Sequence, residues 1–127
     1  GMTNFKAGPQ LFTSNMRHSG LLIREGRLYV FFTNRGDEPE RIMLSTIELT
    51  DDWSEWTASE PIEVLRPEMD YEGADLPLEA SKGGYIDERV HQLRDPAIYQ
   101  EGDKTYLLYS VAGESGIAIA EINFQKP

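Results

Sequence analysis

A three-strand pattern after Arg94-Asp95-Pro96 constrains the fold of this chain more than any other feature of the sequence. Short β-forming runs cover residues 96–99, 105–110 and 117–122, and polar or glycine-containing turns separate them. Runs of this length with turn residues between them predict an antiparallel β-meander. The Arg-Asp pair stands at the start of the first run, where a propeller blade presents side chains to its central funnel.

The same pattern occurs earlier in the chain. Residues 19–26 align with residues 95–102, and one inserted residue, Asp103, then brings 27–29 over 104–106. Repetition at this long spacing predicts a repeat architecture, for which four-stranded blades around an axis are the first candidate. The alternative is a chance likeness, because hydrophobic alternation and Glu-Gly turns are common in β-meanders.

Length and composition restrict the class of protein. The 127 residues, 39% of them hydrophobic, suit one globular domain rather than a disordered chain. The absence of cysteine excludes disulfides and thiolate metal sites. The net charge of −10 argues against a nucleic-acid partner, because phosphate binding needs a basic stripe. No apolar run reaches the roughly 18 to 20 residues of a membrane span. Without a signal-peptide pattern, a cytoplasmic location is expected.

The chain is expected to be all-β, a single domain over residues 1–127 that forms a partial β-propeller. The first blade-like unit covers about 17–65, with a fourth strand at 62–65 and a helical turn near 51–56 capped by Thr50 or Asp51. A long rim connection follows over 66–93, and the second unit covers about 94–124 without a clear fourth strand. Two units cannot close a ring and leave strand edges unpaired, so a homo-oligomer is expected.

The chemistry-bearing residues of this arrangement are carboxylates near one end of the units. Asp95 and Glu114 are expected to share the funnel mouth, with Arg94 pairing with Asp95 and Glu114 as the proton donor. The sequence alignment places His18 under Arg94 and Ser19 under Asp95. Two carboxylates in one polar funnel are what glycoside chemistry requires, one protonated and one ionised. The alternative is structural: Asp-Pro is an ordinary turn starter and Arg-Asp an ordinary ion pair.

These residues carry a family resemblance. Leu93 to Tyr99, followed by Asp103 to Ser110 and Gly116 to Ala120, resembles a blade of the five-bladed β-propeller glycosidases of glycoside hydrolase families 32, 43, 68 and their relatives. The resemblance implies a carbohydrate substrate and gives Asp95 the role of transition-state stabiliser or modulator of the acid's pKa. Glu114 does not match the motif of the family's acid, and the first unit has no aspartate at its inner-strand start.

Further candidates lie in the rim connection. Glu72 and Asp75 are expected to contact substrate or to supply a missing carboxylate, and Arg94 and His18 are further substrate-binding candidates. His18 and His91 lack the close spacing of a zinc motif, so no metal and no cofactor is expected. The alternatives to a hydrolase are a non-catalytic carbohydrate-binding or assembly module, or a structural remnant that needs its oligomer for stability.

Overall fold

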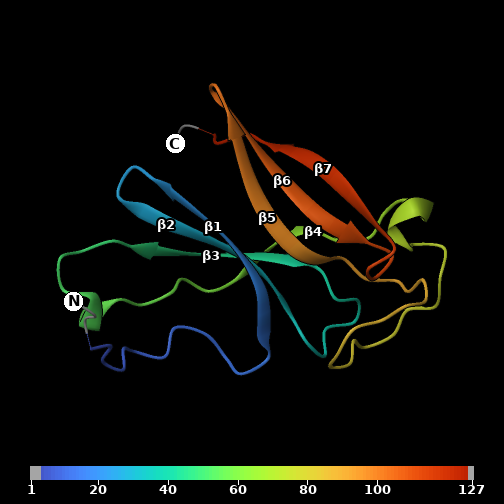
Figure 1. Ribbon diagram of the computed structural model, residues 1–127, viewed down its shortest axis with the longest axis horizontal. Coiled ribbons are helices and arrows are strands. Elements are labelled where there is room, and N and C mark those ends of the chain that lie inside the picture. The colour runs from blue at the N-terminus through green and yellow to red at the C-terminus, as the bar shows by residue number, and fades with distance from the viewer. Residues whose placement is uncertain (1–3, 126–127) are drawn as a thin grey trace.

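The computed structural model describes residues 4–125 and contains two antiparallel sheets (Figure 1). The first sheet has the strand order β1 (Met16–Arg24), β2 (Arg27–Asn34), β3 (Ile42–Glu48) and β4 (Ile62–Leu65). The second has the order β5 (Arg94–Glu101), β6 (Lys104–Val111) and β7 (Gly116–Ile122). The predicted all-β class and both antiparallel meanders, including the strand at 62–65, are confirmed.

Two short 3₁₀ helices lie in the connections, η1 (Trp53–Glu55) and η2 (Asp70–Glu72). The helical turn expected near 51–56 is present as η1, but the predicted cap is wrong. Asp52, rather than Thr50 or Asp51, precedes the turn, and its carboxylate accepts a hydrogen bond from the backbone N–H of Ser54. The cap therefore lies one residue after the later of the two predicted positions, next to the first helical residue.

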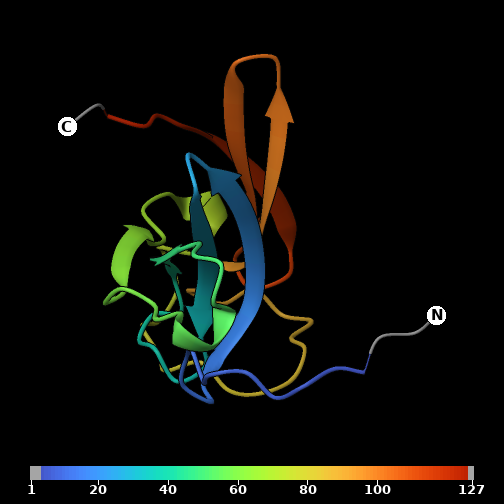
Figure 2. The same cartoon turned by 90° about the vertical axis from the view of Figure 1, so that its left-hand side faces the viewer.

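The main hydrophobic core lies between the two sheets. Its buried members come from both sheets and from the residue before β5: Phe31, Ile42, Leu93, Leu107, Tyr109 and Val111. In β6 the buried residues alternate with less buried ones, as expected for a strand with one face against a core. The other face of the first sheet carries Val30, Phe32 and Ile47, which the chain itself covers with residues such as Phe12 and Trp56. The tip of the β5–β6 hairpin extends beyond the rest of the molecule (Figure 2).

The two sheets repeat with one constant spacing across their first hairpins. Arg17 faces Thr33 across β1 and β2, and Arg94 faces Ser110 across β5 and β6, so equivalent residues are 77 positions apart. The spacing is unchanged at the hairpin ends, where Arg24 faces Arg27 and Glu101 faces Lys104. No residue is inserted between the copies, so the sequence alignment was wrong by one position before the turn. His18 corresponds to Asp95, Arg17 to Arg94, and Ser19 to Pro96.

Both first strands are distorted at the same place. The pairing register shifts between Arg17 and Gly20 in β1 and between Arg94 and Ala97 in β5. Within these irregularities His18 has φ 55° and Asp95 has φ 50°, a left-handed conformation that is uncommon for residues other than glycine. The two strands also approach closely, because a Cβ atom at Gly20 would lie 2.7 Å from the carbonyl oxygen of Pro96. The repeat thus brings two unusual backbone positions to the junction of the sheets.

Candidate functional site

The side chains of His18 and Asp95 meet at this junction. His18 Nε2 lies 3.5 Å from Asp95 Oδ1, and the two side chains are 24% and 44% exposed. Each is also supported by a hydroxyl on the neighbouring strand of its own sheet. His18 Nδ1 lies 3.2 Å from Thr33 Oγ1, and Ser110 donates a hydrogen bond of 3.0 Å to Asp95 Oδ2. Asp95 is therefore open to solvent and fixed on two sides.

The hydrogen-bond network defines where protons lie on His18. Thr33 donates its single hydroxyl proton to Glu40 Oε1 at 2.7 Å, so its oxygen can only accept from the N–H of His18 Nδ1. The other ring nitrogen, Nε2, then faces Asp95, and a proton on it would be shared with that carboxylate. Burial lowers the pKa of His18 from its usual value of 6.5, and the negative charge of Asp95 opposes this effect. Nε2 is thus the ring nitrogen through which His18 interacts with Asp95.

A buried cluster of charged side chains, centred on Glu40, lies next to the His18–Asp95 pair. Glu40 is completely buried and accepts a hydrogen bond of 2.9 Å from Arg17 Nε, while Arg94 Nε lies 3.7 Å from its other carboxylate oxygen. Burial alone would raise the pKa of Glu40, but hydrogen bonds from Arg17 and Thr33 outweigh it, and the pKa is lowered. Glu40 therefore stays ionised between two arginines that occupy equivalent positions in the two sheets.

Arg94 does not pair with Asp95 as predicted. Successive residues of a strand point to opposite faces of the sheet, and the buried Arg94 side chain turns away from the exposed Asp95. It donates to Gln92 Oε1 at 2.8 and 3.0 Å, to Glu114 Oε1 at 3.1 Å, and to the carbonyl oxygen of Gly84 at 3.2 Å. The fold therefore brings Arg94 and Glu114 together. Arg94 also links Glu114 to Glu40, which lies beneath the His18–Asp95 pair.

The connection between β4 and β5 surrounds two hollows on the Arg94 side. One, of about 220 Å³, includes Arg94, Gln92 and Tyr85 in its wall, and the other, of about 200 Å³, includes His91. His91 Nδ1 lies 3.0 Å from the carbonyl oxygen of Leu76, a contact that holds two parts of the connection together. The long connection thus forms concave surface beside the ionic cluster.

The two carboxylates predicted in this connection lie apart from the His18–Asp95 pair. Glu72 is buried, and its carboxylate accepts hydrogen bonds from the backbone N–H groups of Glu68 and Met69 and from the hydroxyl of Tyr109. Burial, followed by the charge of Glu72, raises the pKa of Tyr109 to about 12. Glu72 therefore joins η2 to β6, while the half-exposed Asp75 lies 3.6 Å from Arg89 at the surface.

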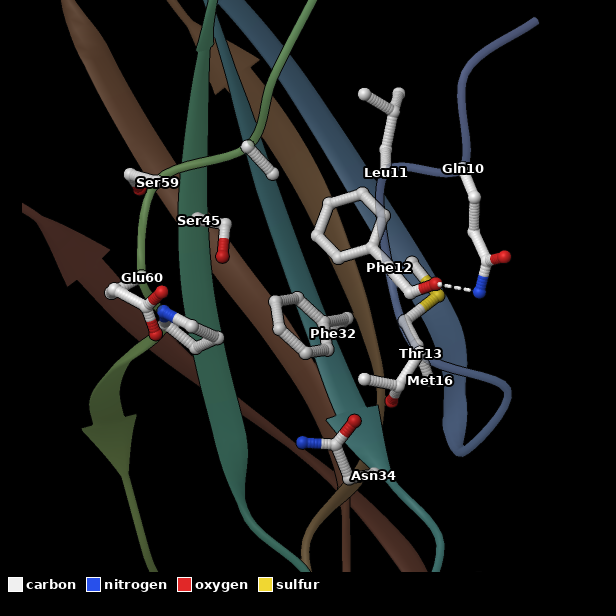
Figure 3. Close-up of a pocket in the computed structure, with 12 residues that line it drawn as sticks. Gln10, Leu11, Phe12, Thr13, Met16, Phe32, Asn34, Ser45, Ser59 and Glu60 are labelled. Atoms are coloured by element: carbon white, nitrogen blue, oxygen red, sulfur yellow. Dashed lines mark hydrogen bonds between the residues drawn. The ribbon is translucent and has the colours of Figure 1, made fainter.

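A further hollow, of about 470 Å³, lies on the opposite face of the first sheet (Figure 3). Phe12 packs edge-to-face against Phe32 at 5.2 Å between ring centroids, and Met16 lies beside them. Ser45 also lines the hollow, and its buried hydroxyl has no hydrogen-bond partner among the described residues. This hollow contains none of the residues predicted from the sequence.

Sequence reasoning missed several members of the site. Four of them contact a predicted residue directly, namely Thr33, Glu40, Gln92 and Ser110, and Arg17 reaches the site through its ion pair with Glu40. The sequence did contain a signal for Arg17, because Arg17-His18 and Arg94-Asp95 are matching pairs when the two copies are aligned with the constant spacing of 77 residues. Glu40 had no such signal, because it lies in the loop before β3 and reaches the site only through the fold.

No group of three or more His, Asp or Glu side chains within residues 4–125 is arranged to hold a metal ion. None of the helices in the described part of the chain is long and apolar enough to cross a membrane.

Comparison with known proteins identifies one similar sequence of viral origin. An uncharacterized protein of Acanthamoeba polyphaga mimivirus is 46% identical over 112 residues, which are 87% of this chain and 32% of the viral protein. The chain therefore spans about a third of the length of this relative. No family model and no solved structure matches the sequence.

Proposed function

We propose that this protein acts on a carbohydrate as a glycoside-hydrolase-like protein, with Asp95 as its central residue. The observation that carries the proposal is the setting of Asp95: a half-exposed carboxylate, 3.5 Å from an imidazole, at the junction of two repeated sheets. Carboxylates in such positions bind sugar hydroxyls and stabilise the positive charge of an oxocarbenium-like transition state. The left-handed backbone at Asp95 supports a functional role, because strained conformations are concentrated at such sites.

The neighbouring residues receive roles that follow from their contacts. His18 touches the sugar beside Asp95 and exchanges a proton with it. Glu114 is the candidate acid, and Arg94 positions it through their 3.1 Å contact. Tyr85 is largely exposed above the adjoining hollow and provides an aromatic face on which a sugar ring stacks. Glu72 and Asp75 have no role in this proposal.

The fold proposed to underlie this site is part of a five-bladed glycosidase propeller. Three observations support it: the two sheets share one register, their first strands lie next to each other, and His18 and Asp95 occupy equivalent positions at the starts of those strands. Inner strands of neighbouring propeller blades have this relationship around a common axis. The greater length of the viral relative leaves room for further blades in that protein.

A non-catalytic carbohydrate-binding module is the second candidate. It is favoured by a specific observation, namely that the first sheet presents His18 where the second presents Asp95. Hydrolysis of a glycosidic bond generally uses two carboxyl groups flanking the bond. Glu114 is already paired with Arg94, so a site that only binds sugars needs no change in these contacts.

Hydrolysis of a panel of aryl furanosides and pyranosides tests the proposal. Asp95→Asn should abolish turnover, and Asp103→Asn, in the β5–β6 turn, should leave it unchanged. Binding to a glycan array that depends on Asp95, without turnover by the wild type, would assign the protein to the second candidate. The absence of both turnover and Asp95-dependent glycan binding would contradict both candidate functions.

A further inference from the structure

A hollow of about 470 Å³ lies on the face of the first sheet that is turned away from β5–β7. Figure 3 shows Phe12, from the segment before β1, on one side of it and Ser59 and Glu60, from the segment before β4, on the other. Phe32 of β2 and Ser45 of β3 lie between them. Sites for small molecules commonly measure about 300–1,000 Å³ and combine apolar walls with a few polar groups. The hollow has the size and the lining of such a site, and it contains none of the residues assigned to the carbohydrate site.

The hydroxyl of Ser45 is the polar exception on this apolar face of the sheet. Ser45 lies directly opposite Val30, on the face that also carries Phe32 and Ile47. It is 1% exposed, and its hydroxyl oxygen has no hydrogen-bond partner among the described residues. Figure 3 shows this hydroxyl pointing from β3 into the hollow. A buried hydroxyl without a partner costs free energy, so a molecule that enters the hollow and pairs with it removes that cost.

The repeat shows that the sheet itself does not require this hydroxyl. Ser45 of β3 and Ala120 of β7 are equivalent, because they face equivalent residues of β2 and β6. By the constant spacing of 77 residues, Asn34 at the end of β2 is equivalent to Val111. In the second sheet both positions are apolar and contribute to the main core. In the first sheet both are polar, and both line the hollow, so the polar groups belong to the hollow rather than to the repeated fold.

We propose that the hollow binds a small uncharged aromatic alcohol of the phenol class, whose ring packs against Phe12 and Phe32 and whose hydroxyl pairs with Ser45. The two phenylalanine rings already meet edge-to-face, and a third ring extends this arrangement. A phenol hydroxyl both donates and accepts, so it matches the serine hydroxyl in either direction. An ion is disfavoured, because the apolar surroundings of Ser45 penalise any charge. The net charge of −10 additionally repels anions such as carboxylates.

NMR titration of the 127-residue protein with para-cresol and with toluene tests the proposal, because the two probes differ only in the hydroxyl group. In the wild type, para-cresol should shift the ring signals of Phe12 and Phe32 in a saturable manner. Ser45→Ala should raise the Kd of para-cresol by about tenfold, since one hydrogen bond is lost, and should leave the Kd of toluene unchanged. Ser115→Ala, in the turn between β6 and β7, is the matched control and should change neither Kd.

Thermal unfolding of Ser45→Ala separates ligand binding from a structural role of the hydroxyl. The variant introduces the residue that the second sheet carries at the equivalent position, Ala120, so its thermal midpoint should be unchanged or higher. A clearly lower midpoint would show that the hydroxyl supports the fold and would overturn the proposal. So would the absence of saturable para-cresol binding, an equal effect of Ser45→Ala on para-cresol and toluene, or shifts centred on His18 instead of Phe12. Benzoate bound as tightly as para-cresol would also overturn it, because the ligand class would then include anions.

Discussion

His18 Nε2 lies 3.5 Å from Asp95 Oδ1, and the two residues hold the same position in the two sheets, 77 residues apart. Neither sheet makes this contact alone. The pair exists because β1 and β5 lie side by side and because each strand carries the same irregularity at the same place. The candidate site is therefore a consequence of the repeat, with a different ionisable residue in each copy.

Replacement of Asp95 should change the titration of His18. The carboxylate raises the pKa of His18 against the larger, opposing effect of burial, so Asp95→Asn should lower that pKa further below 6.5. Titration of the imidazole signals by NMR measures the change, with His91 as an internal reference signal. An unchanged or increased pKa of His18 in the variant would show that the two side chains do not interact.

Stability should fall in acid, for reasons that can be assigned to two residues. The pKa of His18 is lower in the folded state, so the unfolded chain gains a proton first as the pH falls below 6.5, and stability declines from there down to the folded pKa. The lowered pKa of Glu40 stabilises the fold above 4.5, and this contribution is lost as the pH falls through the folded value.

Glu40→Gln separates the contribution of Glu40 to the acid-induced loss of stability from that of His18. It should lower the free energy of unfolding at pH 7 by about 3 kcal/mol, because Arg17 loses its buried partner charge. It should also make the free energy of unfolding fall less steeply below about pH 4.5. Urea unfolding at a series of pH values provides both numbers, and Glu48→Gln at the surface is the control. An equally steep acid decline in Glu40→Gln would exclude this carboxylate as the cause.

Arg94 is expected to be the arginine on which folding depends most. Its guanidinium is buried among Gln92, Glu114 and Glu40. Arg94→Met should therefore cost about 3–5 kcal/mol, since Glu40 keeps a buried charge with one partner fewer. Arg66→Met removes a guanidinium paired with Glu63 in solvent and should hardly change the urea midpoint. Equal midpoints for the two variants would contradict the buried-cluster description.

The spacing of β1 and β5 can be tested at Gly20. A Cβ atom there would lie 2.7 Å from the carbonyl oxygen of Pro96, a backbone atom that cannot rotate away. Gly20→Ala should therefore destabilise the fold by about 1–3 kcal/mol. Gly83→Ala is the control, because its nearest neighbours are Arg35 side-chain atoms at 3.5 Å. A neutral effect of Gly20→Ala on thermal unfolding would show that the strands are further apart.

The strands could be predicted from sequence, but the register between the copies could not. Matching Gly26 with Gly102 led to an alignment with an inserted residue. In the structure Glu25, not Gly26, corresponds to Gly102, and both have positive φ at the first turn position. A glutamate in this conformation is uncommon, so sequence preferences favoured the glycine match. The one-residue error moved His18 from beneath Asp95 to beneath Arg94.

The candidate site was predictable only where a residue's role depends on its own strand. Asp95 at the start of β5 and its exposure follow from the local pattern. The contact of Arg94 with Glu40 instead depends on the loop before β3, which reaches Arg94 only after the sheets have packed. The burial of Glu72 likewise depends on Tyr109 of β6, 37 positions away, which no local pattern in the connection indicates.

The most direct test of the account is an NMR titration of the protein with a panel of saccharides, observed at the His18 imidazole. A bound sugar should shift the His18 ring signals in a saturable manner, together with the Asp95 and Ser110 amides, and Asp95→Asn should abolish the effect. Saturable sugar binding that leaves His18 and Asp95 unmoved, or no binding by any saccharide of the panel, would contradict it.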